Sequence, residues 1–484
     1  MSDYQPTIGL EVHAELTTRT KMFCDSLNDP EERHPNVNVC PVCLGHPGTL
    51  PVANRAAVEH VIKTGLALGG AINAVTKFDR KNYFYPDLPK GYQISQYDEP
   101  LVRGGMLNGV RVRRIHLEED TGTLAHGVGA SLVDYNRAGV PLMELVTEPD
   151  LRSAEETANF ARELQLILRY LGVSDADMEK GQMRIEANVS LDMGTYVELK
   201  NINSFKAAHD AIEYELVRQR EALERGEAIV KETRGWDEAT QKTVAQRSKE
   251  DAHDYRYFPE PDLPPFETAT FEPEKICAAL PELPVTKRMR FAHEYGLDAR
   301  QTELLVGDPA SANYFEAAVS EFAERVDEHA PDASAGTPSS SKRFSVATLF
   351  NYLTSDLRGL MNQNMVAFGD MKVPPEHLAH LAALIDAQKI TSRQAKDLLA
   401  KMFATGGDPE EIVKDEGIGI VSDGTEIEAV VLAVIAEHHA AVVDYKKGKT
   451  ASLQFLIGKA MAQLKGRARP EALREIFERK LGEL

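Results

Sequence analysis

The segment Ile8–Leu16, IGLEVHAEL, constrains the fold of this chain more than any other stretch of its sequence. Successive residues of a β-strand point to opposite faces, and here apolar and polar residues alternate. The apolar face would carry Ile8, Leu10, Val12 and Ala14, and the other face Gly9, Glu11, His13 and Glu15. Carboxylate, imidazole and carboxylate in a row form a ligand set for a divalent metal ion. The alternative is a half-exposed strand whose acidic face is solvated.

The chain has 484 residues, more than one hydrophobic core normally covers, so we expect roughly two to four domains. No apolar run approaches the roughly 18 to 20 residues of a membrane helix. The N-terminus lacks the pattern of a secretory signal, and four cysteines are too few for a disulfide framework. We therefore expect a cytoplasmic protein with no membrane association.

The net charge of −20 argues against a protein coated in basic surface, so any nucleic-acid contact needs a local patch. Such a patch lies between positions 446 and 480, a segment that contains ten Lys or Arg residues and three acidic residues. The residues that we predict to contact nucleic acid are Lys446, Lys447, Lys449, Lys465, Arg467 and Arg469.

The chain changes character along its length. Residues 1–290 predict a mixed α and β domain, with short alternating strands at Gly109–Ile115, Gln182–Leu191 and Thr195–Lys200. Residues 291–405 have a helical pattern, and residues 406–484 form a small helical unit that contains the basic patch. The segment Asp332–Lys342, DASAGTPSSSK, predicts a surface loop because it cannot pack a core.

Two helices within the first domain have clear ends. Ser153 and Glu156 form the pattern of a capping box, and Gly172 would end the helix that they begin. The second helix runs from about Phe205 to Arg225.

Further acidic residues recur in strand-like segments. Glu186 lies in the alternating segment 184–191, Glu144 has apolar neighbours, and HLEEDTG (116–122) holds three consecutive acids. A buried carboxylate is costly unless it is paired or bound to a metal, so several such strands on one sheet face would form a cation site. The alternative for each strand is Arg–Glu pairing or exposure to solvent.

Basic residues could complement that site and hold a nucleoside triphosphate, and the candidates are Lys81, Arg184 and Lys200. The alternative for each residue is a surface ion pair, which explains any one of them alone better than a binding site does. The chain has neither the GxxxxGK[ST] loop nor a GxGxxG motif after a strand, so ATP would not bind through a P-loop or a Rossmann crevice. It also has no GxSxG nucleophile elbow, so any amide hydrolysis would fall to another chain.

Three cysteines make a partial zinc pattern. Cys24, Cys40 and Cys43 could supply three ligands, whereas a structural zinc site takes four. His34 and Asp25 are the candidates for the fourth ligand.

Long motifs carry a family resemblance. They are IGLEVHAEL, KMFC, CPVCLGHPGTLPVAN, FDRKNYFYPDLPKGYQISQ, HLEEDTG, DYNRAGVPLMELVTEPD, ELKNINSF and DYRYFPEPDLPPF. With them the chain resembles the B subunit of aspartyl/glutamyl-tRNA(Asn/Gln) amidotransferase, of the GatB/GatE family, over nearly its whole length. The resemblance implies an α+β fold: an antiparallel-sheet cradle resembling glutamine synthetase, then an all-α helical domain and a YqeY-like helical tail that grips tRNA.

The resemblance also implies a reaction. A subunit of this kind uses ATP to phosphorylate the side-chain carboxylate of misacylated Glu-tRNA(Gln) or Asp-tRNA(Asn). Ammonia that an amidase A subunit makes from glutamine then displaces the phosphate, and a small C subunit completes a heterotrimer. Which of the two tRNAs is the substrate stays open.

Site residues follow from the matching motifs. The implied Mg²⁺ ligands, with Mn²⁺ as a substitute, are Glu11, His13, Glu119 and Glu144, with Glu186 for a second ion. Lys81 would contact phosphate and act with Glu119 in catalysis, and Arg184 and Lys200 would help to bind ATP. Strand alternation puts Glu118 and Glu119 on opposite faces, and the family pattern favours Glu119. Zinc-bearing members have Cys-x-Cys where this chain has Cys24-Asp-Ser26, so one expected zinc ligand is missing.

Two other functions are compatible with parts of the sequence. A non-catalytic scaffold that binds tRNA would also carry the basic patch, and its acidic strands would be structural. A stand-alone ligase of the glutamine synthetase type would act on free amino acids, against which the helical C-terminal regions argue.

Overall fold

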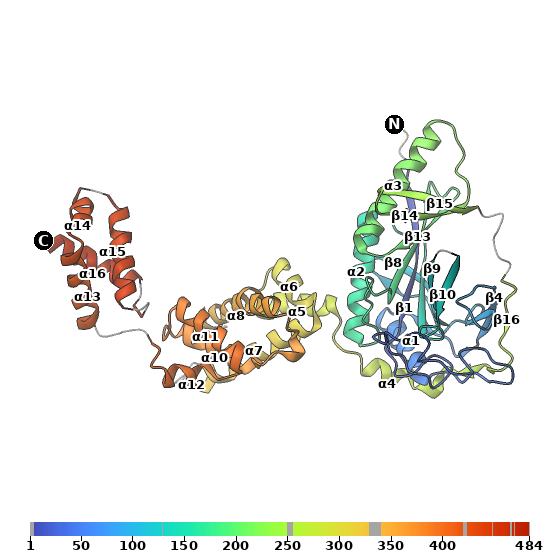
Figure 1. Cartoon of the computed structure of the whole chain (residues 1–484), viewed down its shortest axis with the longest axis horizontal. Coiled ribbons are helices and arrows are strands. Elements are labelled where there is room, and N and C mark those ends of the chain that lie inside the picture. Colours follow the sequence, from blue (N-terminus) through green and yellow to red (C-terminus); the bar gives the residue numbers. More distant parts are fainter. Residues whose placement is uncertain are drawn as a thin grey trace. The chain divides into compact units, whose positions relative to one another are not determined.

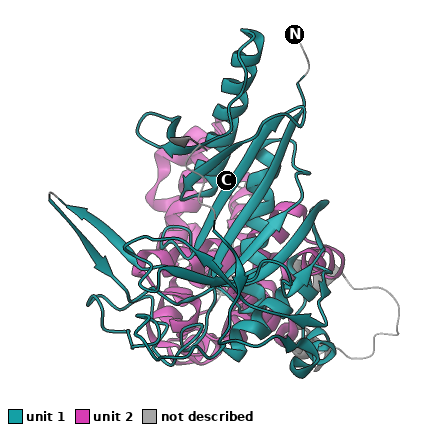
Figure 2. Cartoon of the chain, turned by 90° about the vertical axis from the view of Figure 1, so that its right-hand side faces the viewer, with its two compact units in different colours: residues 1–284 teal, residues 285–484 magenta. Residues whose placement is uncertain are grey.

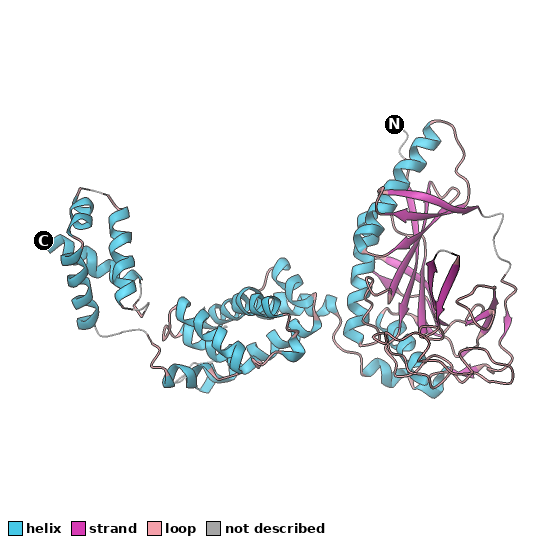
Figure 3. Cartoon of the chain, in the orientation of Figure 1, coloured by secondary structure: helices cyan, strands magenta, loops and turns pink. Residues whose placement is uncertain are grey.

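The structure, a computed structural model, describes residues 4–127, 129–248, 255–328, 340–419, 424–447, 449–464, 467–468 and 470–483. The chain divides into two compact units, residues 1–284 and 285–484 (Figure 2). All the described strands belong to the first unit, and the described elements of residues 285–484 are helical (Figure 3). No helix among the described residues is long and apolar enough to cross a membrane.

A ten-stranded sheet is the frame of the first unit (Figure 1). Its strands lie in the order β15-β14-β13-β12-β1-β11-β8-β6-β2, and β7 pairs with β8. Their bounds are β1 (Pro6–Glu15), β2 (Ala71–Ile72), β6 (Val102–Arg103), β7 (Met106–Leu107), β8 (Val110–Glu119), β11 (Pro141–Thr147), β12 (Met183–Leu191), β13 (Val197–Ile202), β14 (Glu232–Asp237) and β15 (Lys242–Ser248).

The sheet is antiparallel except at one pair. Strands β13 and β14 run parallel, which differs from the antiparallel sheet that the sequence led us to expect. The reason lies in their connection, because the helix α3 (Phe205–Glu224) comes between them and a crossover of this kind returns the chain in the same direction.

Three smaller sheets complete the strands of this unit. They are β16 (Phe258–Pro259), β4 (Asp79–Asn82) and β5 (Tyr92–Ser95) in that order; the hairpin β9 (Thr123–Gly127) with β10 (Ala130–Asp134); and β3 (Val75–Thr76) with β17 (Phe266–Glu267).

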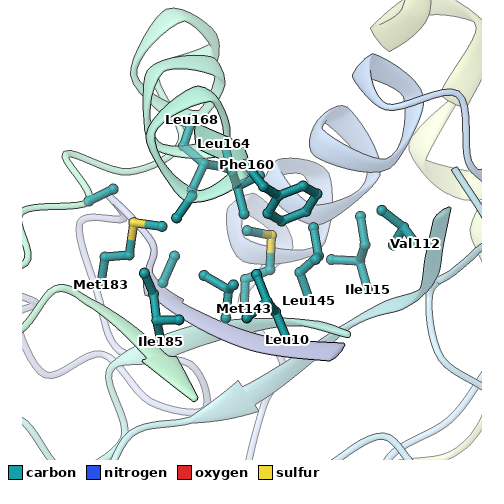
Figure 4. Close-up of a cluster of buried hydrophobic side chains, with 14 of the residues drawn as sticks. Leu10, Val112, Ile115, Met143, Leu145, Phe160, Leu164, Leu168, Met183 and Ile185 are labelled. Carbon is teal, nitrogen blue, oxygen red and sulfur yellow. The ribbon is translucent and has the colours of Figure 1, made fainter. Parts of the chain in front are cut away.

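The apolar face of the large sheet is covered by helices. These are α1 (Arg55–Ala67), α2 (Ala154–Leu171) and α3, and a short α4 (Pro273–Ala278) follows later in the chain. Figure 4 shows Phe160 and Leu164 of α2 over Leu10 and Ile185 of the strands, and all four are at most 1% exposed. The alternation in β1 is confirmed: its apolar side chains enter this core, and Glu11, His13 and Glu15 lie on the other face, partly accessible.

The ends of α2 follow the sequence with one difference. Ser153 accepts a hydrogen bond from the backbone N–H of Glu156, and Gly172 ends the helix at φ 65°. The Glu156 carboxylate accepts from the backbone N–H of Arg152 and not from that of Ser153. The expected capping box is therefore present only in its first half, because Glu156 reaches back one residue further.

The second unit consists of helices. They are α5 (Pro284–Tyr295), α6 (Ala299–Val306), α7 (Pro309–Glu328), α8 (Ser340–Asn351), α9 (Arg358–Asn364), α10 (Pro375–Asp386), α11 (Ser392–Thr405), α12 (Pro409–Asp415), α13 (Gly424–Glu437), α14 (His439–Lys446), α15 (Ala451–Gln463) and α16 (Pro470–Glu483). The last four share their own buried apolar cluster, which includes Val431, Leu456 and Phe477.

Two expectations about organisation need comment. Most of the predicted loop Asp332–Lys342 lies outside the described residues, but its last three residues begin α8, so the prediction of a loop is wrong there. The division at residues 290 and 405 stays a prediction; the compact units meet at Pro284 and Val285.

Candidate active site

The polar face of the sheet gathers the acidic residues of four adjacent strands. In the register of β1, Glu11 stands opposite Glu186 of β12, and His13 stands opposite Glu144 of β11. Glu144 is in turn opposite His116 of β8. Because side chains at paired positions point to the same face, these residues converge on one side of the sheet.

The converging side chains line a cavity of about 400 Å³, here called the acidic cavity. Its lining includes Glu11, His13, Lys81, Arg114, His116, Glu118, Asp120, Glu144, Arg184, Glu186, Lys200, Tyr255 and Tyr257. The small sheet of β4 and β5 contributes Lys81, so strands of two sheets form its walls.

The centre of the cavity is a compact group of possible metal ligands. One ligand atom each of His13, Glu118 and Glu144 lies within 4.8 Å of the others. The Nε2 atom of His13 is 3.2 Å from Oε2 of Glu144. The Nε2 atom of His116 is 3.5 Å from Oε1 of Glu118 and 3.6 Å from Oε2 of Glu144.

Glu119 does not join this group. It forms a close ion pair with Lys90 and accepts a hydrogen bond from the backbone N–H of Ile94 at 2.9 Å. It lines a second, smaller cavity of about 70 Å³ together with Lys90 and Cys43. The expected placement of Glu119 beside Glu144 is therefore wrong, because alternation along β8 turns Glu118, and not Glu119, toward the acidic cavity.

Charges crowd the acidic cavity and shift its pKa values. Burial and the nearby carboxylates of Glu144 and Glu186 raise the pKa of Glu11. Burial alone would raise the pKa of Glu144 too, but His116 and His13 lower it to about 2. Burial likewise opposes ionisation of Glu118, and Lys81 and His116 outweigh it, so the pKa of Glu118 falls well below its usual range.

The three predicted basic residues line the same cavity. The Nζ atom of Lys81 is 3.8 Å from Oε1 of Glu118 and lies over the ring of Tyr255. Arg184 pairs with Asp120 at 2.9 Å, and Lys200 pairs with Glu186 at 2.7 Å. Each of these cations therefore lies beside a carboxylate of the site.

The acidic cavity fits a hard divalent cation. Carboxylate oxygens are the preferred ligands of Mg²⁺, and here they project from paired strands into one cavity, with Glu118 and Glu144 buried. The repulsion between Glu11, Glu144 and Glu186 is the electrostatic situation that a bound cation relieves. Glu11, His13, Glu118, Glu144 and Glu186 are the residues that could hold it.

Several members of the site were not among the predicted site residues. Within HLEEDTG the sequence led us to favour Glu119, whereas the structure turns His116 and Glu118 of β8, and Asp120 just after it, into the cavity. Tyr255 and Tyr257 line the cavity from a distant segment, and nothing in the local pattern places them there.

The predicted zinc ligands Cys24, Cys40 and Cys43 do come together, with their sulfur atoms within 4.8 Å of one another. We call them the cysteine cluster. The hydrogen bond from Cys24 lowers the pKa of Cys43 to about 4, although burial opposes this, and the backbone N–H of Cys40 and the buried Lys21 act in the same direction.

The cysteine cluster has three thiols and no fourth metal ligand among the described residues. The Oγ atom of Ser26, at the position where the resemblance led us to expect a fourth cysteine, lies 3.8 Å from Sγ of Cys43. Neither Asp25 nor His34 belongs to the cluster; the His34 ring is 86% exposed and bonds to Glu32. The set of residues therefore falls one short of the four ligands of a structural zinc site.

The predicted nucleic-acid contacts lie in the second unit. Lys446, Lys447 and Lys449 are exposed, and Arg467 is partly buried. Lys465 and Arg469 lie outside the described residues.

Comparison with known proteins identifies the class of the first unit. Residues 6–271 match the family model described as the GatB/GatE catalytic domain, so the cavity lies within a catalytic domain of that class. Residues 339–481 match a second model, described as the GatB domain.

Full-length relatives make the assignment more specific. The chain is 46% identical to the B subunit of aspartyl/glutamyl-tRNA(Asn/Gln) amidotransferase from Thermomicrobium roseum, with 99% of both chains covered. It is 45% identical to the corresponding B subunit of Dehalococcoides mccartyi over 100% of both chains, and 44% identical to that of Persephonella marina over 98% of this chain and 99% of the relative. The chain belongs to the family of aspartyl/glutamyl-tRNA(Asn/Gln) amidotransferase B subunits.

Proposed function

We propose that the acidic cavity is where ATP activates the side-chain carboxylate of glutamate or aspartate esterified to tRNA, and where ammonia then converts that carboxylate to an amide. The observation that carries the proposal is the convergence of carboxylates, imidazoles and four Lys or Arg side chains in one cavity. The names of the relatives, which specify both tRNA types, support an aminoacyl-tRNA as the substrate.

The reaction has two balanced steps. A carboxylate oxygen of the tRNA-bound amino acid attacks the γ-phosphorus of ATP, and ADP leaves. Ammonia then attacks the acyl carbon, inorganic phosphate leaves, and the nitrogen loses a proton. The first step is needed because a carboxylate is a poor electrophile, whereas the acyl phosphate has a good leaving group.

Metal ligation falls to Glu11, His13, Glu118, Glu144 and Glu186, with Glu118 taking the place first given to Glu119. A bound Mg²⁺ would neutralise phosphate charge and hold phosphate oxygens in line. Mn²⁺ is an expected substitute, because His13 brings a nitrogen atom to the set.

Lys81, Arg184 and Lys200 have the chemistry to hold phosphate oxygens. All three stay charged, because neighbouring carboxylates outweigh burial and raise their pKa values; at Lys81 the main carboxylate is that of Glu118. A fixed cation at that position stabilises the charge that develops as the γ-phosphoryl group transfers.

The chain would work in an assembly. We propose a heterotrimer with an amidase A subunit that releases ammonia from glutamine and a small C subunit, and the designation of the relatives as B subunits supports several chains. We further propose that the sheet resembles the cradle of glutamine synthetase, a likeness supported by the carboxylates on one face of it.

The tail would contact tRNA through its exposed lysines. Replacing Lys446, Lys447 and Lys449 by Glu should weaken tRNA binding and reduce the slope of its dependence on salt, because fewer phosphate charges are neutralised. Filter binding across a salt series measures both. An unchanged slope would remove this patch from the interface.

The function itself is tested on the chain purified with its partners. Amidation of Glu-tRNA(Gln) and of Asp-tRNA(Asn) is measured with and without ATP and glutamine, and formation of ADP is followed alongside. ATP-dependent amidation that Glu11→Gln abolishes, while tRNA still binds, supports the proposal. Normal amidation by that variant in an intact complex would leave the non-catalytic scaffold as the better account.

A further inference from the structure

A third group of possible metal-ligand side chains lies in the helical unit. His377 and His380 stand three residues apart on α10, so they share one side of that helix. Asp408 directly precedes α12, and Glu410 lies in its first turn. We call these four residues the histidine–aspartate cluster.

The two imidazoles approach the same oxygen atom. The Nδ1 atom of His380 is 2.5 Å from Oδ2 of Asp408, and the Nε2 atom of His377 is 3.6 Å from that oxygen. Ligand atoms of His380, Asp408 and Glu410 lie within 4.8 Å of one another. Three residues from two helices thus direct nitrogen and oxygen lone pairs toward one small region.

The two carboxylate oxygens of Asp408 have different partners. Its Oδ1 atom accepts hydrogen bonds from the backbone N–H groups of Glu410 at 2.7 Å and Glu411 at 3.4 Å, which caps α12. The cap fixes the carboxylate, and Oδ2 therefore points to the histidines. A carboxylate held in this way is a preorganised ligand.

His380 has the outer contact that metal-bound histidines usually have. Its Nε2 atom lies 3.4 Å from Oε1 of Glu321 on α7, on the side of the ring away from Asp408. A carboxylate on the far nitrogen orients the ring and increases its basicity toward a metal. The ring is also buried, with its side chain 9% exposed, so its orientation is fixed by packing as well.

Simple helix pairing accounts for only part of this arrangement. One histidine would satisfy Oδ2 of Asp408, yet a second one faces the same atom. A cation between the rings and the carboxylate would use both imidazoles at once.

We propose that His377, His380 and Asp408, with Glu410 as the fourth ligand, bind a divalent transition-metal ion that joins α10 to the start of α12. Two imidazole nitrogens with carboxylate oxygens favour Zn²⁺ or a similar first-row ion over Mg²⁺. The ion replaces the hydrogen bond between His380 and Asp408, and its role is to stabilise the helical unit.

The experiment uses the full chain after treatment with a chelator. Zn²⁺ binding is measured by titration calorimetry, and the Co²⁺ form is measured by visible absorption. Ligation by nitrogen and oxygen gives d–d bands without the sulfur-to-cobalt charge-transfer band that the cysteine cluster would produce. The thermal midpoint should rise with added Zn²⁺ and fall again with chelator, since binding to the folded state stabilises it.

Two variants and a control decide the matter. Asp408→Asn keeps an N-cap residue but removes the charged ligand, and His377→Gln removes a partly exposed ligand. The acidic cavity also offers nitrogen and oxygen ligands, so each variant is compared with the wild type. Each should lower the affinity of the site in the helical unit at least about tenfold, as loss of even an outer partner does. His439→Gln, an exposed histidine of the same unit, should change nothing. Wild-type affinity in both ligand variants, or no non-sulfur Co²⁺ signal in the wild type, would overturn the proposal.

Discussion

Glu118 and Glu119 are neighbours in β8, yet they enter two different regions of the first unit, and these regions treat metal ligands in different ways. Glu118 enters the acidic cavity, whose ligands project from paired strands. Glu119 enters the smaller cavity beside the cysteine cluster, where Cys24 and Cys43 lie outside the named strands and helices. In a strand, alternation determines the face on which a side chain lies. In a loop, the position of a side chain depends on its individual contacts.

The two regions also balance charge differently. In the acidic cavity, Lys81, Arg184 and Lys200 pair with carboxylates but do not remove the repulsion at Glu11, so room for a cation remains. In the cysteine cluster, the buried Lys21 lies 3.8 Å from Sγ of Cys43 and supplies a positive charge of its own. The difference suggests that the first region needs a metal ion to act, whereas the second folds without one.

Replacing each carboxylate of β8 by an amide tests most directly whether the two regions differ in function. We expect Glu118→Gln to lower ATP-dependent amidation at least about a hundredfold, because it removes a charged ligand from the site of phosphoryl transfer. Its thermal midpoint should fall less than that of Glu119→Gln, because Lys81 lies 3.8 Å from Glu118 and keeps the charge of Glu144 nearby. Steady-state amidation assays and thermal melts of the assembled complex measure both quantities. Full activity would remove Glu118 from the site.

Glu119→Gln should lower the free energy of unfolding more than Glu118→Gln does, because the ion pair of Glu119 with Lys90 is the closer one. It leaves the Lys90 ammonium buried without its carboxylate, and breaking a buried ion pair costs about 3–5 kcal/mol of the free energy of unfolding. Chemical denaturation of the first unit within the full chain measures the loss. The double variant Lys90→Met/Glu119→Gln should recover most of it, because the unpaired charge is gone. A double variant no more stable than the single one would contradict this account of the pair.

Glu118 and Glu119 also show where alternation in the sequence predicts the face of a side chain and where it fails. The alternation of β1 gave the correct faces for Glu11 and His13, because that strand is regular and its apolar side enters the core. In β8, the register with β11 shifts between Val146 and Thr147, where β8 holds an extra residue. Such a bulge reverses the phase of alternation, so counting from Val110 and Val112 would put Glu119 on the polar face.

Other features depend on contacts that no local pattern encodes. The meeting of Cys24 with Cys43 followed from motif spacing, but the burial of Lys21 beside them and the exposure of His34 did not. Tyr255 and Tyr257 reach the acidic cavity through chain topology. Periodicity predicts faces and elements well, whereas the composition of a cavity depends on long-range packing.

The cysteine cluster can be given a fourth thiol by substitution of Ser26. Ser26→Cys restores a fourth thiol next to Cys43, so the variant should bind Zn²⁺ at least about tenfold more tightly than the wild type, since a structural site takes four ligands. The control is Ser26→Ala, which removes the hydroxyl group without adding a ligand. Competition with a chromogenic chelator gives the affinities. Equal affinities in Ser26→Cys and Ser26→Ala would show that a residue other than Ser26 limits the site.

The smallest expected effect concerns the residue that spacing proposed as a fourth zinc ligand. His34→Gln should leave Zn²⁺ affinity unchanged, because the exposed ring bonds to Glu32 and does not belong to the cysteine cluster. The free energy of unfolding should change by less than about 0.5 kcal/mol, as expected for a surface substitution away from buried networks. The same competition assay and a denaturant titration test this. A clear loss of Zn²⁺ affinity would mean that the loop carrying His34 closes over the thiols when metal binds, and the cysteine cluster would then resemble the acidic cavity in needing its ion.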